Sequence, residues 1–360
     1  MGTSLLTNQS AMNALQTLRS IGDNMDQTQR RVSTGLRINE ASDNTAYWSI
    51  SSMMRSDRNA LSSVSDAMAL GKSQIDVADA TIDKSKTYLD NIQKSLTTAY
   101  EKGAGDIKKI QADIKGNMND IQSAVYSASL AEKNILGNDG QSVRIAGSYR
   151  REGSNVYVDM IDVGGADLNF ASKKADGSFD LTKGVLKDVF GSGTEGSTAP
   201  DFKQLSQTLT DKEKALAALP EGDAGIAQAK QDVEDAKKAI SDAAEKMTVS
   251  DFVNADFTDV SSSTMEEILK NVQGKVTTAT TNVVTAGATL GAAKAQVTGQ
   301  IDYVSKLMDA VDKGVGSLVD ADMNAESARL ASLQVQQQLG IQALSIANQN
   351  SQNILSLFRQ

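Results

Sequence analysis

Apolar residues recur at alternating steps of three and four residues over two long stretches of the chain. In the first, residues 61–99, only Gly71 and Ser85 interrupt the apolar positions, and both are small enough for helices to approach closely. In the second, a Leu or Val recurs at every seventh residue from 269 to 318. Roughly 50 residues of helix at 1.5 Å per residue span about 75 Å, and such a helix needs neighbours along its length. The pattern predicts an elongated, antiparallel coiled-coil-like bundle.

Both ends of the chain continue this helical pattern. The spacing of Leu15, Leu18, Met25 and Val32 predicts an N-terminal helix, and residues 107–128 predict a helix that runs back along the first long one. The C-terminal segment has more apolar positions than one partner helix can cover. These positions form two sets: Val335, Leu339, Ile346 and Leu357, beside Leu330, Leu333, Leu344, Ile354 and Phe358. One partner helix would therefore leave a surplus of apolar surface uncovered.

The middle of the chain has a different pattern. Apolar residues alternate at 143–145 and 156–163, which predicts two strands of a β-hairpin, with Gly147, Gly153, Gly164 and Gly165 as turn positions. Residues 166–204 predict loops and short strands. Residues 205–247 predict two helices divided near Pro220, and the hydroxyl residues at 261–264 predict the N-cap of the long C-terminal helix. The fold class is therefore mainly α, with a β-hairpin and a small α+β domain inserted between the helical arms.

Composition excludes several classes of function. The chain has 360 residues, which favours two or three domains, a formal net charge of −9, and neither His nor Cys. The missing side chains exclude imidazole and thiolate chemistry, and the negative charge argues against a nucleic-acid partner. Charged residues such as Arg19 and Asp23 interrupt any apolar run near the N-terminus, so we expect no cleaved signal peptide and no membrane insertion. We also expect no catalytic residue, metal or cofactor.

A glycine motif at residues 191–196 fits the dinucleotide-binding pattern G-x-G-x-x-G. That pattern binds a pyrophosphate only when a buried strand precedes it and a helix follows it. Here the segment before the motif, residues 186–190, contains charged as well as apolar residues, and Pro200 follows shortly after the motif. We therefore interpret the motif as a surface loop.

The two termini together carry a more specific signal. The N-terminal motifs TNQSAMNAL at 7–15, VSTGLRIN at 32–39 and ASD at 41–43 resemble those of bacterial flagellins. The C-terminal motifs VDAD at 319–322, LGI at 339–341, ANQ at 347–349 and QNILSLFR at 352–359 resemble the flagellin C-terminus. The resemblance covers roughly residues 1–140 and 265–360 and does not extend to the middle.

The resemblance implies an architecture and a function: a structural subunit that polymerises into the filament used for swimming. Residues 1–44 with 317–360 would form an inner tube, 45–163 with 262–316 an outer tube, and 164–261 a surface-exposed domain. Inner-tube packing would involve Leu15, Leu18, Met25, Val32, Leu333, Leu339, Leu344, Ile354, Leu357 and Phe358. Residues 33–42 would form a spoke between the tubes, held by Arg37, Asn39 and Asp43.

The resemblance also implies partners and a location. The partners would be copies of the chain, related flagellins, the flagellar cap, junction proteins and an export chaperone, and the chain would be secreted into the extracellular filament. Two other functions remain open at this point. A hook–filament junction protein shares the same terminal helices, and a secreted enzyme on a flagellin scaffold would need a carboxylate cluster in residues 164–261, where the sequence shows none.

Two segments differ from flagellins that immune receptors recognise. Flagellins that activate the Toll-like flagellin receptor resemble one another in the segment LQRVREL. Aligned on Leu89, this chain has Asn91, Gln93 and Lys94 in place of Arg, Arg and Glu. Residues 30–51 align with the epitope that plant receptor kinases bind, but Tyr47, followed by Trp48, stands where that epitope has Gly. The resemblance therefore implies weak recognition by both receptors.

Overall fold

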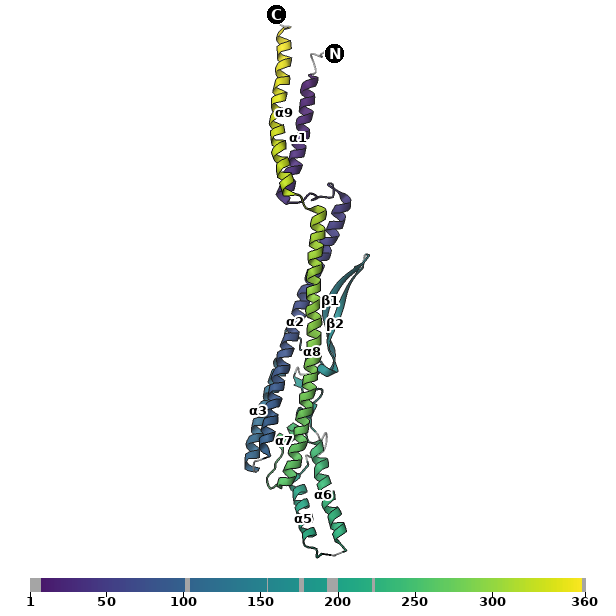
Figure 1. The fold of residues 1–360 in the computed structure, drawn as a ribbon, viewed down its shortest axis with the longest axis vertical. Helices are drawn as coiled ribbons and strands as arrows, with labels where there is room; N and C mark the ends of the chain where they lie inside the picture. The colour runs from purple at the N-terminus through teal and green to yellow at the C-terminus, as the bar shows by residue number, and fades with distance from the viewer. Residues whose placement is uncertain are drawn as a thin grey trace. The chain divides into compact units, whose positions relative to one another are not determined.

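The computed structural model describes residues 8–100, 104–153, 155–174, 178–192, 200–221 and 224–357. Long helices dominate it, and a two-stranded hairpin lies in the middle of the chain, which confirms the predicted fold class (Figure 1). The chain divides into two compact units. One comprises residues 1–63 and 304–360, and the other comprises residues 64–303. Helices α2 (Thr45–Ala99) and α8 (Ser262–Val319) contribute residues to both units.

The first unit contains a pair of terminal helices. Helices α1 (Gln9–Thr34) and α9 (Met323–Leu357) pack against each other and run side by side (Figure 1). The side chain of Asn8 caps α1 by accepting a 3.0 Å hydrogen bond from the backbone N–H of Ala11. Gly35 ends α1 in the left-handed conformation, with φ of 72°, which a glycine adopts without strain.

The second unit is organised around α2 and α8, with α3 (Ala104–Ser127) returning beside them. The apolar heptad positions predicted in this unit lie in its core, including Ile75, Leu89, Val276 and Leu290, and Ser85 is buried with them. Gly71 has a steric reason to lack a side chain, because a Cβ there would collide with the side chain of Ile145 on the hairpin. The element that comes close at Gly71 is therefore the hairpin, whereas a helix was expected there from the sequence.

Strands β1 (Ser142–Glu152) and β2 (Asn155–Gly164) form the predicted antiparallel hairpin. Ile145 pairs with Ile161, and both side chains are buried against the helices. Gly153 has φ of 62° in the turn, as expected for a hairpin glycine. The prediction of a turn at Gly147 was wrong, because this residue lies inside β1, where the register shifts between Ala146 and Ser148 as in a β-bulge.

The remaining elements belong to the inserted region of the second unit. They are η1 (Ala166–Leu168), β3 (Ser172–Lys173), β4 (Phe179–Asp180), α4 (Lys187–Phe190), α5 (Phe202–Ala217), α6 (Ile226–Lys246) and α7 (Val249–Asn254). Helices α5 and α6 are the two helices predicted around Pro220, and they share a small core of Leu209, Val233 and Ile240. The predicted cap of α8 is also confirmed, since the side-chain hydroxyl of Ser261 accepts the N–H of Thr264 at 3.3 Å. Helix α7 was not predicted.

Candidate assembly surfaces

Specific polar contacts join α1 to α9 within the first unit. A guanidinium nitrogen of Arg31 lies 3.1 Å from a carboxylate oxygen of Glu326, and both side chains are largely buried. At the other end of the pair, the side chain of Asn8 donates a 3.0 Å hydrogen bond to the carbonyl of Ala347. Because these contacts lie near opposite ends of the helices, they fix the register of α1 against α9.

The terminal pair leaves a large part of its apolar surface uncovered within the single chain. Val335, Leu339 and Ile346 on α9 are 55–61% exposed, and Leu15 on α1 is exposed as well. Of the other predicted packing residues, Leu333 is buried, whereas Leu18, Met25, Val32 and Leu344 are half-buried. The side chains of Ile354 and Leu357, and all of Phe358, lie outside the described residues.

The segment after α1 is attached to the end of α8 by backbone and side-chain contacts. The guanidinium of Arg37 donates a 2.8 Å hydrogen bond to the carbonyl of Leu318, and the N–H of Arg37 donates to the carbonyl of Val319 at 2.7 Å. An apolar component of this attachment was not predicted from the sequence. Ile38 is buried with Val315 and Val319, so this predicted spoke segment combines polar contacts with a small core.

Asp43 organises the turn that leads from this segment into α2. Its carboxylate accepts hydrogen bonds from the backbone N–H groups of Asn39 at 3.0 Å and Glu40 at 3.1 Å. These two bonds are the main reason that the pKa of Asp43 lies below its usual value of 3.8, and the nearby positive charges of Arg31 and Arg30 lower it further. Asn39 thus contributes its backbone amide to the turn.

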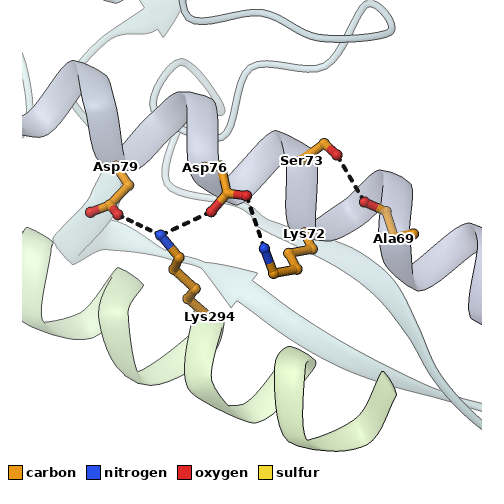
Figure 2. A network of polar contacts seen from close by, with 6 residues as sticks. All are labelled: Ala69, Lys72, Ser73, Asp76, Asp79 and Lys294. Carbon is orange, nitrogen blue, oxygen red and sulfur yellow. Dashed lines mark hydrogen bonds and ion pairs between the residues drawn. The ribbon is translucent and has the colours of Figure 1, made fainter. Parts of the chain in front are cut away.

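A network of charged side chains joins α2 to α8 in the second unit, and Figure 2 shows its geometry. The ammonium group of Lys294 on α8 lies 2.9 Å from carboxylate oxygens of both Asp76 and Asp79 on α2. Lys72, one turn before Asp76, donates to the same Asp76 carboxylate at 3.1 Å. The pKa of Lys294 is raised, first by its hydrogen bond to Asp76 and then by the bond to Asp79. This network was not predicted from the sequence.

The positions that differ from receptor-activating flagellins lie on two sides of α2. Asn91 and Lys94 line a shallow groove between α2 and α3, and the amide of Asn91 donates to Asn117 on α3 at 3.4 Å. Gln93 instead reaches toward α8, where its amide lies 3.5 Å from the hydroxyl of Thr277. The structure therefore brings Asn91 and Lys94 together and separates Gln93 from them.

Among the described residues, no group of three or more acidic residues is placed to hold a metal ion, and no helix combines the length and the apolar character needed to span a membrane. Most of the glycine motif at 191–196 lies outside the described residues. The terminal helices α1 and α9 pair and expose apolar side chains, which is typical of a surface that contacts other protein chains.

Comparison with known proteins identifies the family. Residues 5–142 match the bacterial flagellin N-terminal helical region, and residues 273–358 match the bacterial flagellin C-terminal helical region. The chain is 50% identical to a flagellin of Bartonella bacilliformis over 96% of this chain and 97% of that protein. It is also 38% identical to a flagellin of Brucella melitensis, with 99% of each chain covered, and 37% identical to flagellin A of Rhizobium meliloti, with 99% of this chain and all of that protein covered.

The chain belongs to the flagellin family and is a structural subunit of the extracellular bacterial flagellar filament. The filament itself is a polymer of such subunits. These comparisons favour the filament subunit over a hook–filament junction protein, and flagellins are a structural rather than an enzymatic family.

Proposed function

We propose that the terminal pair, residues 1–44 and 317–360, forms the inner tube of the filament. Residues 45–163 and 262–316 then form the outer tube, and residues 164–261 form the domain exposed on the filament surface. The observation that carries this proposal is the exposure of Val335, Leu339 and Ile346 on α9. A helix with apolar side chains on its solvent side is favoured where neighbouring helices cover that side.

The energetics of burial support assembly through this surface. At about 25 cal/mol per Å², burying roughly 300 Å² of apolar surface contributes about 7 kcal/mol before the entropic cost of association. An interface between two different surfaces of the same chain that does not close into a ring produces an open helical polymer. Burial of the exposed apolar surface of α9 in an interface that does not close into a ring would account for a filament.

Export and partners follow from the same function. The chain would leave the cell unfolded, without a cleaved signal peptide, with the help of an export chaperone. The absence of Cys suits this route, because a disulfide would block passage through a narrow channel. Junction proteins, the flagellar cap and related flagellins would contact its assembly surfaces. We expect no cofactor, no nucleic-acid partner and no insertion into a membrane.

A triple variant tests the inner-tube assignment. Val335→Ser, Leu339→Ser and Ile346→Ser remove exposed apolar groups, so the monomer should keep its helical circular dichroism but fail to sediment as filaments. The matched control, Ala217→Ser, Ala227→Ser and Ala239→Ser, places three serines at exposed helical positions of the inserted region. The control should sediment like wild type. Normal filaments from the α9 variant would contradict the assignment.

A truncation tests the same assignment at the end of the chain. Deleting residues 350–360 removes Ile354, Leu357 and Phe358 from the proposed inner tube. We expect a soluble, helical monomer and no pellet after centrifugation. Pelleting at the wild-type level would show that these residues do not contribute to the inner tube.

A further inference from the structure

A cavity of about 520 Å³ lies between helices α5 and α6 and the start of α8, within the second unit. Its apolar lining residues, Leu209 on α5 and Ile240 on α6, belong to the small core that these two helices share. The volume is within the range of roughly 300–1,000 Å³ that is typical of small-molecule sites. The cavity therefore has the size of a ligand site and an apolar floor on which part of a ligand can pack.

Charged side chains of both signs surround this floor and form the rim of the cavity. All four are exposed: the carboxylates of Glu213 and Glu234, and the ammonium groups of Lys237 and Lys238. Within the part of the chain that the structure describes, none of the four forms an ion pair. This holds even for Glu234 and Lys238, whose spacing of one helical turn favours such a pair. Two carboxylates and two ammonium groups are therefore available to charged groups of a ligand.

The remaining carboxylate in the lining, that of Glu267 on α8, already has partners. It accepts hydrogen bonds from the hydroxyl of Ser241 on α6 at 3.2 Å and from the amide of Asn271 at 3.2 Å. The ammonium group of Lys270 lies 3.7 Å from its other oxygen. Because the bond between Ser241 and Glu267 joins α6 to α8, it holds the wall of the cavity in place while the rim charges stay available.

We propose that this cavity binds a zwitterionic small molecule with an apolar side chain, of the chemical class of a short peptide with free ends. The ammonium group of the ligand contacts the rim carboxylates, its carboxylate contacts the rim lysines, and its side chain packs on Leu209 and Ile240. Charge-assisted hydrogen bonds of this kind are about twice as strong as those between neutral groups. Such binding is independent of the assembly of the chain into a filament.

The charges of the rim disfavour other classes of ligand. A simple anion would meet two carboxylates, and a simple cation would meet two ammonium groups. A wholly apolar molecule would cover charged groups without offering them a partner, which costs free energy. Nor is any acidic cluster among the described residues placed to hold a metal ion. A zwitterion satisfies both signs of charge at once, and its apolar part covers the floor.

Methyl NMR of the full-length monomer tests the site directly, with the dipeptide leucylleucine as the probe. We expect the methyl resonances of Leu209 and Ile240 to shift and to saturate with a dissociation constant of about 1 mM or below. The same dipeptide with an acetylated N-terminus and an amidated C-terminus lacks both charges and should bind about tenfold more weakly. Equal affinity for the two probes would overturn the proposal. The absence of saturable shifts at these residues with about 20 mM leucylleucine would also overturn it.

A variant of the two rim lysines provides a second test. Lys237→Gln with Lys238→Gln should weaken leucylleucine binding about tenfold and leave binding of the acetylated and amidated probe unchanged. The matched control, Lys214→Gln with Lys230→Gln, removes two exposed lysines of the same helix pair that do not line the cavity. The control should bind leucylleucine like wild type, with unchanged circular dichroism in both variants. Wild-type affinity in the rim variant, or an equal loss in the control, would overturn the proposal.

A neutral polyol and a sedimentation assay complete the test. The disaccharide trehalose should give no saturable shift at Leu209 and Ile240, and shifts equal to those with leucylleucine would overturn the proposal, because trehalose carries no charge. Sedimentation of the same samples measures assembly separately. The absence of dipeptide binding in a chain that forms filaments would therefore overturn the site and leave the filament function intact.

Discussion

The ammonium group of Lys294 on α8 donates a 2.9 Å hydrogen bond to the carboxylate of Asp79 on α2, 215 positions away in the sequence. The same ammonium lies 2.9 Å from a carboxylate oxygen of Asp76, one turn earlier on α2. Apolar seams allow long helices to slide by a heptad at little cost, because each seam residue meets a similar residue after the slide. One lysine can contact both aspartates in one register only, so this network specifies how α2 and α8 align.

Replacing Lys294 should therefore lower stability and loosen the register of α2 against α8. Lys294→Met leaves Asp79 without its lysine partner and Asp76 with Lys72 alone. We expect the midpoint of thermal unfolding, followed by circular dichroism, to fall by about 2–4 °C, the change typical of a modest destabilisation in a domain of this size. The difference should shrink in 1 M salt, where the Debye length is about 3 Å.

Lys275→Met provides the matched control for this prediction, because Lys275 is on the same helix but outside the network. It should unfold close to the wild-type temperature. An equal fall in both variants would mean that the effect comes from loss of positive charge on α8 rather than from the contacts with α2.

The part of this unit that could be predicted is the part that depends on local periodicity. Ile75, Leu89, Val276 and Leu290 each lie at a seam position that is visible within a short window of sequence, and all are buried. The Lys294 network could not be predicted in the same way. It depends on which turn of α8 faces which turn of α2, and periodicity leaves that register open. Only the spacing of Lys72 and Asp76, one helical turn apart, was visible as a local signal.

The missed features elsewhere have similar causes. Gly147 has the composition of a turn, but its place in a bulge depends on its pairing with β2. Helix α7 has six residues, which is too short for a helical period to be detected, although Thr248 and Asp251 form a capping box that could have marked its start. The spoke was predicted from the resemblance to flagellins, with polar residues holding it, whereas the burial of Ile38 depends on the end of α8, which is distant in the sequence.

The turn at Asp43 should open at acidic pH. The folded-state pKa of this carboxyl lies below its usual value of 3.8. The ionised group therefore stabilises the turn above that value, and the stabilisation is lost as the pH falls through the lower, folded-state pKa. Hydrogen exchange of the amides of Asn39 and Glu40, corrected for intrinsic rates, should be slow at pH 6 and accelerate below about pH 4.

Two variants separate Asp43 from its acidic neighbour in this experiment. Asp43→Ala should give fast exchange of both amides at every pH, because it removes the acceptor. Glu40→Gln should keep the wild-type profile, since the Glu40 carboxylate does not cap these amides. Persistent protection in Asp43→Ala would show that other contacts hold the turn.

Activation of the Toll-like flagellin receptor should be weak or absent. An amide at Asn91 and a reversed charge at Lys94 replace the Arg and Glu of activating flagellins, and loss of close charged contacts at a buried interface costs roughly 2–5 kcal/mol. In a receptor reporter-cell assay, we expect a response at least tenfold below that of an enterobacterial flagellin. The triple change Asn91→Arg, Gln93→Arg and Lys94→Glu should recover part of the response. An unmodified chain that activates as strongly as the enterobacterial protein would refute the prediction.

Plant recognition of residues 30–51 should also be weak, for a steric reason. The plant epitope matches this chain at several positions, including Gly35 and Asp43, but it has Gly where this chain has Tyr47. Receptor and co-receptor close over that Gly, and a phenol ring in a space shaped for no side chain prevents close approach of the backbone. The neighbouring Trp48 enlarges the obstruction. In addition, Asn44 replaces an acidic residue and removes a charge-assisted contact.

A synthetic peptide of residues 30–51 should therefore elicit little or no oxidative burst in leaf tissue. The same peptide with Tyr47→Gly should recover part of the burst, because it restores the space without changing any other position. A peptide with Asn44→Asp alone should remain inactive, since the added charge does not relieve the clash at Tyr47. A full burst from the unmodified peptide would show that the receptors accommodate both rings, and equal inactivity of the Tyr47→Gly peptide would assign the loss to positions other than Tyr47.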